Sequence, residues 1–268
     1  MKPISKCSNT ELLDATIATL NSALTLERCL ESILANIPVR SIFVVDGGSS
    51  DGTLEIAKKH DVRLIEERAL LGWTRYIQAK ICQTEWIAYV DSDVYVYDAW
   101  WKNVSRYWKQ PDVGMILGFA DAPTNNLPIY DKYLKHRAKK EGTVAFSNTL
   151  IRRRLVLECE DELRHVHAGE DDIVAKHVKA SGFKIITIPE PLCFHDRDPF
   201  ETHPKAYRRS GRSARTRYGL HGVTVVPNAL ISMIIAWYNF SRETGRHSLR
   251  LFLFLLRLWI EYAIGFLI

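Results

Sequence analysis

The chain has 268 residues, of which 47% are hydrophobic and 25% are charged. This balance is typical of a folded globular protein and excludes a disordered, collagen-like or disulfide-stapled chain. Single hydrophobic cores stop growing at roughly 250 to 300 residues, so the length suits one large domain, or one domain with a small appendage, which we favour. The formal net charge of +5 suits anionic partners. We expect no nucleic acid among them, because the charge is mild and no nucleic-acid recognition motif occurs.

The cysteines and the amino terminus bear on the compartment. The five cysteines are widely spread without CxxC spacing, which favours a reducing compartment over a zinc site or redox pair: Cys7, Cys29, Cys82, Cys159 and Cys193. The opening MKPISKCSNTELL lacks the apolar core of a signal peptide. We therefore expect the amino-terminal body to be cytoplasmic.

Short β-rich runs alternate with amphipathic stretches in the first half of the chain. Strands are predicted over residues 15–20, 41–46, 62–67, 86–91 and 113–118. Apolar residues with helical spacing predict a helix over residues 26–37. This repeated strand, helix, strand order predicts an α/β fold with a parallel sheet. Such sheets bind ligands beyond the carboxyl ends of their strands, so the polar residues that end these runs are the first functional candidates.

The pattern from about residue 120 to 200 is less regular. It contains a basic region that we expect to be a loop, with Lys132, Lys135, Arg137, Lys139 and Lys140. An acidic helix start follows at Glu170, and this helix should stop at Gly182, ahead of the strand KIITI.

After Pro204 the composition shifts, so we divide the chain into a domain of residues 1–204 and a basic, apolar helical region of residues 205–268. Six basic residues crowd its start, and three of them share one helical face by their spacing: Arg208, Arg212 and Arg215.

Two apolar segments, 223–238 and 249–268, finish the chain. Each carries polar or charged residues, so neither is a convincing transmembrane helix. In the second segment Arg250, Arg257 and Glu261 fall on one narrow face of an apolar helix. Such a helix could lie in the membrane interface with these charges toward the headgroups. The alternative is a buried helical hairpin with the charged face toward solvent.

Acidic side chains end two of the predicted strands. Asp91 and Asp93 close the apolar run WIAYV, where a turn can aim both carboxylates at one hard cation such as Mg²⁺ or Mn²⁺. Asp46 ends the run VVD ahead of GGSSDGT, where it could accept hydrogen bonds from a base or from sugar hydroxyls. A turn that merely links strand to helix explains the second motif equally well.

A third acidic group lies in the first turn of a predicted helix, at Glu170, Asp171 and Asp172. Acids there suit the helix dipole, so a structural role is one explanation. The same dipole should keep an acid ionised at neutral pH, which is the state that a general base requires.

In order and spacing, these motifs resemble the inverting nucleotide-sugar glycosyltransferases of family 2, which have the GT-A fold. The resemblance covers roughly residues 12 to 200 and rests on an ordered series: TIATLN at 16–21, LERCLESIL at 26–34, VVDGGSSDGT at 44–53, Arg75, DSD at 91–93, GED at 169–171 and Gly182. It implies a Rossmann-like, mostly parallel sheet flanked by helices, to which we add a membrane-associating helical appendage.

The resemblance also implies roles for single residues. The nucleotide pocket would use Ala18, Thr19, Asn21, Asp46, Arg75 and Ser92. The metal-binding role would fall to Asp91 and Asp93, and His195 resembles a late histidine that completes a metal or diphosphate site, although it could equally be structural. Asp171 matches the general base, and Glu170 would help to hold the base or the acceptor hydroxyl.

Three departures from the family pattern loosen these assignments. The family often has a second acid where this chain has Gly47, a proline where it has Ala18 and an arginine where it has His177. The first departure leaves the nucleotide open between uridine and guanosine diphosphate.

The expected function is a metal-dependent, inverting glycosyl transfer at the cytoplasmic face of the cell membrane, where the protein would be peripheral or monotopic. A cation held by Asp91 and Asp93 would stabilise the leaving diphosphate, and Asp171 would deprotonate the acceptor hydroxyl. An acceptor that is already ionised, such as a polyprenyl phosphate, needs no base. The oligomeric state stays open.

The arginine-rich stretch bears on the acceptor. Arg208, Arg209 and Arg212 are candidates for binding the phosphate of a polyprenyl phosphate or of a lipid-linked saccharide. Alternatively, they form a solvated basic face that only docks on anionic lipid.

Two rival functions belong to other classes. A sugar-phosphate nucleotidyltransferase would carry a glycine-rich basic loop near its amino terminus, where this chain reads TIATLNSALT. A non-catalytic, membrane-associated nucleotide-sugar-binding module would need no acid triad.

Overall fold

The computed structural model describes residues 12–123, 127–141, 145–219 and 224–268. Cys7 and most of the opening stretch that bears on a signal peptide lie outside the described residues.

The described residues form one eight-stranded mixed sheet with the order β3-β2-β1-β4-β7-β6-β8-β5. Its strands are β1 (Leu13–Thr19), β2 (Val39–Asp46), β3 (Arg63–Glu66), β4 (Trp86–Asp91), β5 (Val94–Val96), β6 (Val113–Asp121), β7 (Asn148–Arg152) and β8 (Lys184–His195). All five strands predicted in the first half are present. The parallel arrangement holds for β3-β2-β1-β4 and for the pair β6 and β8. Strand β7 is antiparallel to both neighbours and β5 is antiparallel to β8.

Helices cover both faces of this sheet, and both faces are therefore apolar. One core lies under α1 (Leu26–Asn36), α2 (Thr53–Lys59) and α4 (Ala99–Val104). The other lies under α3 (Leu71–Ile81), α6 (Arg153–Leu157), α7 (Glu160–Leu163) and α8 (Glu170–Ala180). Successive side chains of strand β4 point to opposite faces of the sheet, so the strand contributes to both cores. Ala88 and Val90 lie in the first core, and Ile87 and Tyr89 lie in the second.

The sheet curls, and the connection from β4 to β5 shows why it must. These strands stand fourth and eighth in the sheet, which in a flat sheet would separate them by about 19 Å. Only Ser92 and Asp93 join Asp91 to Val94, and three residue steps reach at most about 11 Å. The β5 edge is therefore folded back toward the carboxyl end of β4.

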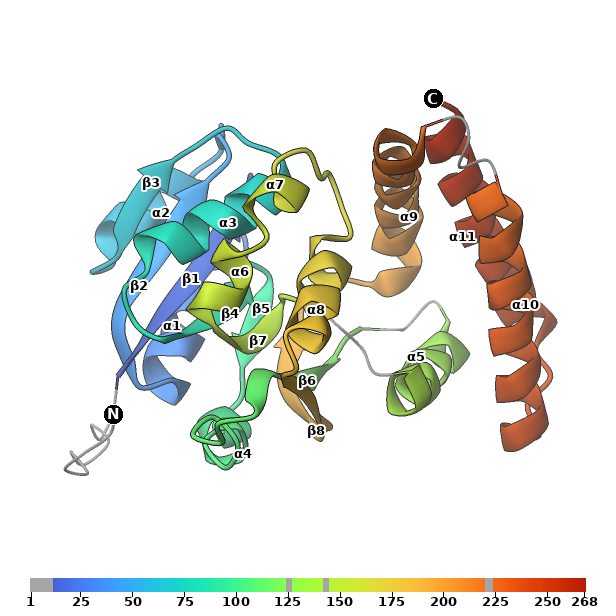
Figure 1. Ribbon diagram of the computed structural model, residues 1–268, viewed down its shortest axis with the longest axis horizontal. Helices are drawn as coiled ribbons and strands as arrows, with labels where there is room; N and C mark the ends of the chain where they lie inside the picture. Colours follow the sequence, from blue (N-terminus) through green and yellow to red (C-terminus); the bar gives the residue numbers. More distant parts are fainter. Residues whose placement is uncertain (1–11, 124–126, 142–144, 220–223) are drawn as a thin grey trace.

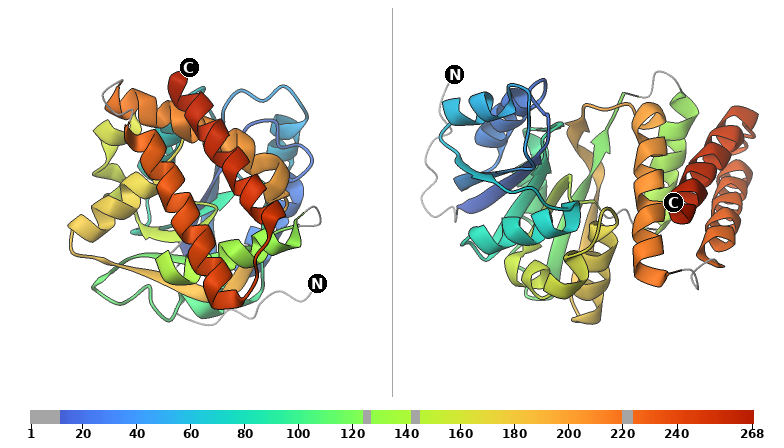
Figure 2. Two further views of the ribbon diagram at one scale, coloured as in Figure 1. Left: turned by 90° about the vertical axis from the view of Figure 1, so that its right-hand side faces the viewer. Right: turned by 90° about the horizontal axis from the view of Figure 1, so that it is seen from above.

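Four helices gather around a third core at one end of the molecule, away from β3 (Figure 1): α5 (Pro128–Glu141), α9 (Pro199–Tyr218), α10 (Val225–Thr244) and α11 (Leu249–Leu267). Helix α9 lies between the sheet and the pair α10 and α11 (Figure 2). The two apolar segments and the arginine-rich stretch are helical as predicted, whereas the basic region predicted as a loop lies in α5. None of the described helices has both the length and the apolar character needed to cross a bilayer.

The boundary expected after residue 204 falls inside α9. This helix begins earlier, because Asp198 caps it by accepting a hydrogen bond from the amide of Phe200 at 2.8 Å, and Pro199 occupies its first position. The sheet and the carboxyl-terminal helices therefore meet through one continuous element.

Helices α9 and α11 approach so closely that glycine is required at the crossing. A Cβ atom on Gly265 would lie 2.0 Å from the carbonyl oxygen of Arg208, and one on Gly211 would lie 2.1 Å from that of Tyr262. Beside this contact Arg208 pairs with Glu261 at 2.6 Å. The expectation that Arg250, Arg257 and Glu261 form one outward charged face is therefore wrong for Glu261, which is held by α9.

Candidate active site

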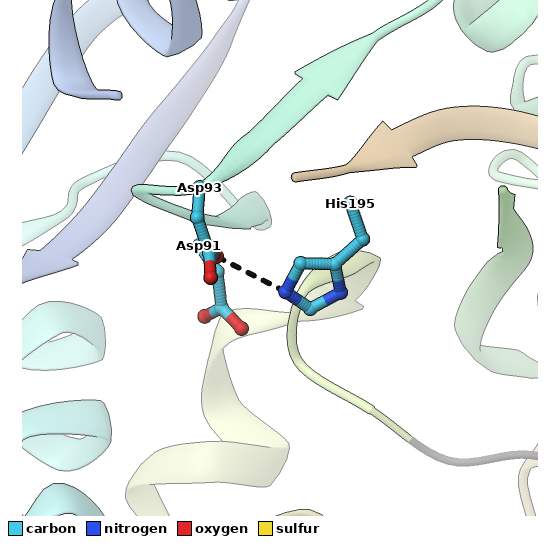
Figure 3. Close-up of side chains that lie close together, drawn as sticks. All are labelled: Asp91, Asp93 and His195. Atoms are coloured by element: carbon cyan, nitrogen blue, oxygen red, sulfur yellow. Dashed lines mark hydrogen bonds and ion pairs between the residues drawn. The ribbon is translucent and has the colours of Figure 1, made fainter. Parts of the chain in front are cut away.

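Two carboxylates and an imidazole converge where β4, β5 and β8 meet (Figure 3). One ligand atom from each of Asp91, Asp93 and His195 lies within 4.8 Å of the other two. His195 Nε2 and Asp93 Oδ1 are 3.0 Å apart. The curl of the sheet produces this arrangement, since His195 pairs in register with Val94, the residue after Asp93.

The buried Arg75 links this cluster to helix α8. Its side chain is 3% exposed, and Nη2 donates to Asp91 Oδ1 at 2.6 Å while Nε lies 3.9 Å from Glu170 Oε1. Burial would raise the pKa of Asp91, but the charge of Arg75, supported by His195 and Arg197, lowers it below its ordinary value. Asp91 is thus held ionised and oriented, as a metal ligand must be.

The acids predicted at a helix start open α8. Gly169, at φ +84°, lets the chain turn sharply into this helix. Burial raises the pKa of Glu170, although the charge of Arg75 opposes the shift. Desolvation, together with the charges of Glu170 and Asp172, raises the pKa of Asp171 to about 7. The two neighbouring carboxylates repel each other, which disfavours the state in which both are ionised.

A cavity of about 280 Å³ joins these groups into one site. It is lined by carboxylates from β4 and α8 and by three guanidinium groups, those of Arg75, Arg197 and Arg209. The predicted residues Asp91, Glu170 and Asp171 thus meet in one cavity, although about 80 residues separate Asp91 from the other two in the chain. Arg197 was missed, and its signal was its place two residues after His195 in CFHDRD.

The residues predicted for the nucleotide pocket come together at the ends of β1 and β2. Thr19 and Asp46 pair in register, and the Thr19 hydroxyl donates to Asp46 at 2.8 Å. Asp46 also accepts hydrogen bonds from the amides of Gly48 and Ser49 and from the Ser49 hydroxyl. These bonds outweigh burial and lower the pKa of Asp46. Its carboxylate therefore anchors the loop and has little capacity left for a base.

The remaining three pocket candidates lie along the same edge of the sheet. Asn21 accepts from the amide of Ser50 at 2.9 Å and adopts a left-handed φ of 51°. Ala18 pairs in register with Asp91. The hydroxyl of Ser92 lies 2.8 Å from that of Ser22. Together these contacts fasten the loop after β1 to the loops after β2 and β4.

A second cavity, of about 540 Å³, adjoins the loop after β2. Gly47 lines this cavity. Glu67, Arg68 and Trp73 also line it, and the sequence motifs did not single out these three residues. Arg68 packs over Gly48, where a Cβ atom would lie 2.4 Å from its Nε. The sequence could have indicated Glu67 and Arg68 through their position, because they follow directly on β3, where such sheets bind ligands.

The three arginines predicted for the acceptor phosphate separate in space. Arg209 lines the catalytic cavity. Arg208 is paired with Glu261, and Arg212 is exposed on α9 outside that cavity. The helix therefore brings one of the three to the site.

A comparison with known protein families identifies the family of this chain. The profile of "Glycosyl transferase family 2" matches residues 14–167, more than half of the chain. The chain belongs to this family. No curated protein matches it in sequence. Family membership supports a family 2 glycosyltransferase over the nucleotidyltransferase and the non-catalytic module.

Solved glycosyltransferase structures share the fold of this family 2 chain. The mannosyltransferase PcManGT from Pyrobaculum calidifontis, in complex with GDP-Man and Mn²⁺, is 17% identical, with a TM-score of 0.63 over 95% of this chain and 86% of its own. S. aureus TarS 1–349 with UDP-GlcNAc is 14% identical, with a TM-score of 0.57 over 94% and 82%.

A third relative is glucosyl-3-phosphoglycerate synthase from Mycobacterium tuberculosis, with Mn²⁺, UDP and its product. It is 14% identical, with a TM-score of 0.54 over 78% of this chain and 80% of its own. The chain spans 65% and 40% of two other TarS structures, TarS 1–349 and TarS. These likenesses show a GT-A-like fold, a curled mixed sheet flanked by helices.

Proposed function

We propose that this glycosyltransferase moves a sugar from a UDP- or GDP-linked donor to an acceptor presented by a membrane. The observation that carries the proposal is the convergence of Asp91, Asp93 and His195 beside a cavity that also holds Glu170 and Asp171. A site of this kind joins a cation-binding cluster to a pair of acids, which are the two requirements of an inverting transfer from a nucleotide diphosphate.

The donor class is supported by the relatives of the same fold. PcManGT was crystallised with GDP-Man and Mn²⁺, and the synthase with UDP and Mn²⁺. In this chain the buried Arg75 has an Nε without a hydrogen-bond acceptor among the described residues. A buried cationic donor next to the acid cluster suits an anionic ligand.

The donor set fits a divalent cation. Two carboxylates suit Mg²⁺ or Mn²⁺, and the imidazole nitrogen of His195 suits a transition metal, so Mn²⁺ fits the whole set. Asp91, Asp93 and His195 would hold the ion. When bound, it supplies positive charge to the leaving diphosphate, a contribution of several kcal/mol in such sites.

The chain's own residues would do the rest. Arg75 holds Asp91 in its ligand orientation, and Glu170 keeps its place through the same guanidinium. Asp171 takes the proton of an attacking sugar hydroxyl, which frees the oxygen to attack the anomeric carbon from the face opposite the diphosphate. A single displacement inverts that centre. An ionised phosphate acceptor would need only positioning by these acids.

The acceptor phosphate would meet Arg209, with Arg197 across the same cavity. One guanidinium group can donate two parallel hydrogen bonds to the oxygens of a phosphate. This favours a lipid phosphate or a lipid-linked diphosphate saccharide as the acceptor. Of the arginines that the sequence predicts for the acceptor phosphate, we therefore retain Arg209, since Arg208 is already neutralised by Glu261.

A membrane surface is supported by an exposed apolar stripe on the two outermost helices. On α10 it has helical spacing, and α11 adds a second row: Ile231, Ile234, Ile235 and Tyr238, then Leu249, Leu253 and Ile260. Arg250 and Arg257 are exposed beside the second row. An apolar stripe flanked by arginines suits an anionic membrane interface.

We propose that the protein is peripheral or monotopic at the cytoplasmic face of the cell membrane. Among the described residues, the cysteines are buried free thiols, which suits a reducing compartment: Cys29, Cys82, Cys159 and Cys193.

The test of the function is a donor screen. Purified protein is incubated with UDP- and GDP-sugars, Mg²⁺ or Mn²⁺ and a lipid extract, and release of nucleoside diphosphate is measured. We expect one donor to be turned over, with Mn²⁺ preferred. Asp93→Ala should lower the rate by at least tenfold, because the cation loses a charged ligand.

Asp98→Ala is the matched control, since Asp98 is an exposed carboxylate five residues away and outside the cluster. Turnover that is independent of metal, or that survives Asp93→Ala unchanged, would reject the proposed site. Release of pyrophosphate from a nucleoside triphosphate would instead indicate a nucleotidyltransferase.

A further inference from the structure

A third cavity lies among the carboxyl-terminal helices, outside the catalytic site. It measures about 630 Å³, within the range of about 300 to 1,000 Å³ that holds small organic ligands. Helices α5, α9, α10 and α11 line it. Much of its wall is apolar, with Met233, Ala236, Leu255, Leu258 and Trp259, and its polar lining includes Arg137, Ser210, Ser232 and Asn239. The indole N–H of Trp259 donates to the carbonyl of Val226 at 2.9 Å, so this side chain makes no polar demand on a ligand.

One end of this cavity borders the catalytic cavity. Ser210 lines both, and its neighbour Arg209 lines the catalytic side. The Ser210 hydroxyl donates to the carbonyl of Ala206 at 3.1 Å within α9, so its proton needs no further partner at this junction. Ser210 is therefore the lining residue that the two cavities have in common, and it follows directly on Arg209 in α9.

The other end meets the exposed apolar stripe. Ile235 lines the cavity and is 53% exposed, and Ser232, one turn of α10 away, also lines it and is exposed. Residues of α10 thus line the cavity at the stripe proposed to face the membrane, and Ser210, next to Arg209 in the chain, lines it from α9. Figure 2 shows α9 between the sheet and the pair α10 and α11.

We propose that this cavity binds the hydrocarbon chain of the acceptor while Arg209 binds its phosphate. The inference rests on the proposed function and deepens it, because it gives the acceptor's chemical class: a long hydrocarbon chain joined to a phosphate. The free energy gained by burying a hydrocarbon chain grows with the number of CH₂ groups buried, so chain length should govern affinity.

The test is a binding titration with dodecyl phosphate and butyl phosphate, each below its micelle-forming concentration, followed by calorimetry. We expect dodecyl phosphate to bind at least tenfold more tightly. Ala229→Phe and Ser232→Phe, which fill the cavity from α10, should each weaken dodecyl phosphate at least tenfold and leave butyl phosphate unchanged. Ser232 is exposed, so its variant should fold even where Ala229→Phe does not.

Asn228→Phe is the matched control, because Asn228 is exposed on the same helix and does not line the cavity. It should bind both probes as the wild type does. A dodecyl phosphate with a terminal bromine should also quench the emission of Trp259, and Trp259→Phe should remove that part of the quenching.

Two outcomes would overturn the inference. If the filled variants bind dodecyl phosphate like the wild type, the chain binds elsewhere. If dodecanol binds as tightly as dodecyl phosphate and Arg209→Gln changes neither, the cavity holds a membrane lipid chain and not the acceptor. The proposed function fails by a separate measurement, the absence of Mn²⁺-dependent donor binding in the wild type.

Discussion

Asp171 lies in the first turn of α8, beside the buried Glu170 and within the cavity that Arg75 and Arg209 also line. The helix dipole was expected to keep this acid ionised, and that expectation was wrong in direction. Desolvation and the charges of Glu170 and Asp172 raise the pKa of Asp171 to about 7. A general base works best when its pKa is close to the operating pH, so the shift suits the deprotonation of a hydroxyl.

We expect kcat/KM for transfer to a hydroxyl acceptor to fall about tenfold per pH unit below pH 7. The sign follows from the raised pKa, because the carboxyl accepts a proton only when ionised, above about pH 7. Asp171→Asn should lower the rate by ~10² to 10⁴ and remove this acidic limb. The measurement is a pH profile of kcat/KM between pH 5 and 9.

Asp161→Asn is the control, because Asp161 is an exposed acid in α7 that does not line the cavity. It should leave the profile unchanged. A profile without an acidic limb near pH 7, with most activity kept in Asp171→Asn, would rule out the base role and indicate an acceptor that arrives ionised, as a phosphate.

Asp46 shows why a motif residue can have a structural role. Its two carboxylate oxygens accept four hydrogen bonds from Thr19, Gly48 and Ser49, and the residue is fully buried. Removing a buried acceptor leaves its donors unpaired, at about 1 to 3 kcal/mol each. The loop geometry that presents Gly47 to the neighbouring cavity therefore depends on Asp46.

At the scale of elements, the predicted strands were recovered because their apolar residues are contiguous and end at polar turns. Strands β5 and β7 were missed. Strand β5 has three residues, and β7 has five that lie on the boundary of α6, too few for a period to be counted. Both owe their conformation to antiparallel pairing with distant partners.

The crossing of α9 and α11 gives a prediction for elements. Gly265→Ala puts a Cβ atom 2.0 Å from the backbone oxygen of Arg208, so the helices must move apart. Overpacking of this kind costs about 1 to 3 kcal/mol. We expect the melting temperature to fall by several degrees and sugar transfer to fall with it, because α9 carries Arg209. Thermal unfolding and initial rates measure the two effects.

Gly52→Ala is the matched control. Its Cβ atom would meet Ala23 at 3.8 Å, an ordinary contact, and Gly52 has a negative φ. Gly52 is the N-cap of α2, where alanine is poorer than glycine, so the melting temperature of Gly52→Ala should fall by less than that of Gly265→Ala. A Gly265→Ala protein as stable and as active as Gly52→Ala would show that α9 and α11 are not packed as described.

At the scale of the whole molecule, the helices at one end give the protein a face unlike the rest. A stripe of exposed apolar side chains follows α10 and α11, and the large apolar cavity opens at it. Ser210 of α9 lines both this cavity and the catalytic one.

We expect the protein to sediment with anionic lipid vesicles, and Ile231→Glu with Tyr238→Glu to weaken this binding by more than tenfold. Both residues are more than half exposed and neither lines the cavity. Burying one large apolar side chain contributes about 1.5 to 3 kcal/mol, and 1.4 kcal/mol is tenfold in affinity. Vesicle co-sedimentation measures the change.

Leu34→Glu is the control, since Leu34 is as exposed as Ile231, at 53%, and lies on α1, at the other end of the molecule (Figure 1). Its vesicle binding should match the wild type. Equal loss in both variants, or no vesicle binding by the wild type, would reject the membrane face.

The sequence alone determined the five strands of the first half, the helix starts at residues 26 and 170, and the chemical types at strand ends, because these depend on neighbours within a few residues. Periodicity marked β1, β2 and β4, and their order brought Asp46 and Asp91 to one edge. The separate acidic turn at Glu170 and Asp171 was likewise visible as a helix start.

Only the tertiary structure decided which of these groups meet. His195 reaches Asp93 across 102 positions because the sheet curls and β5 pairs with β8. The close crossing of α9 and α11 assigns Arg208 to Glu261 and leaves Arg209 at the catalytic cavity. Contacts of this range depend on sheet order and helix packing, which are set by the summed burial of apolar surface and leave no local mark in the chain.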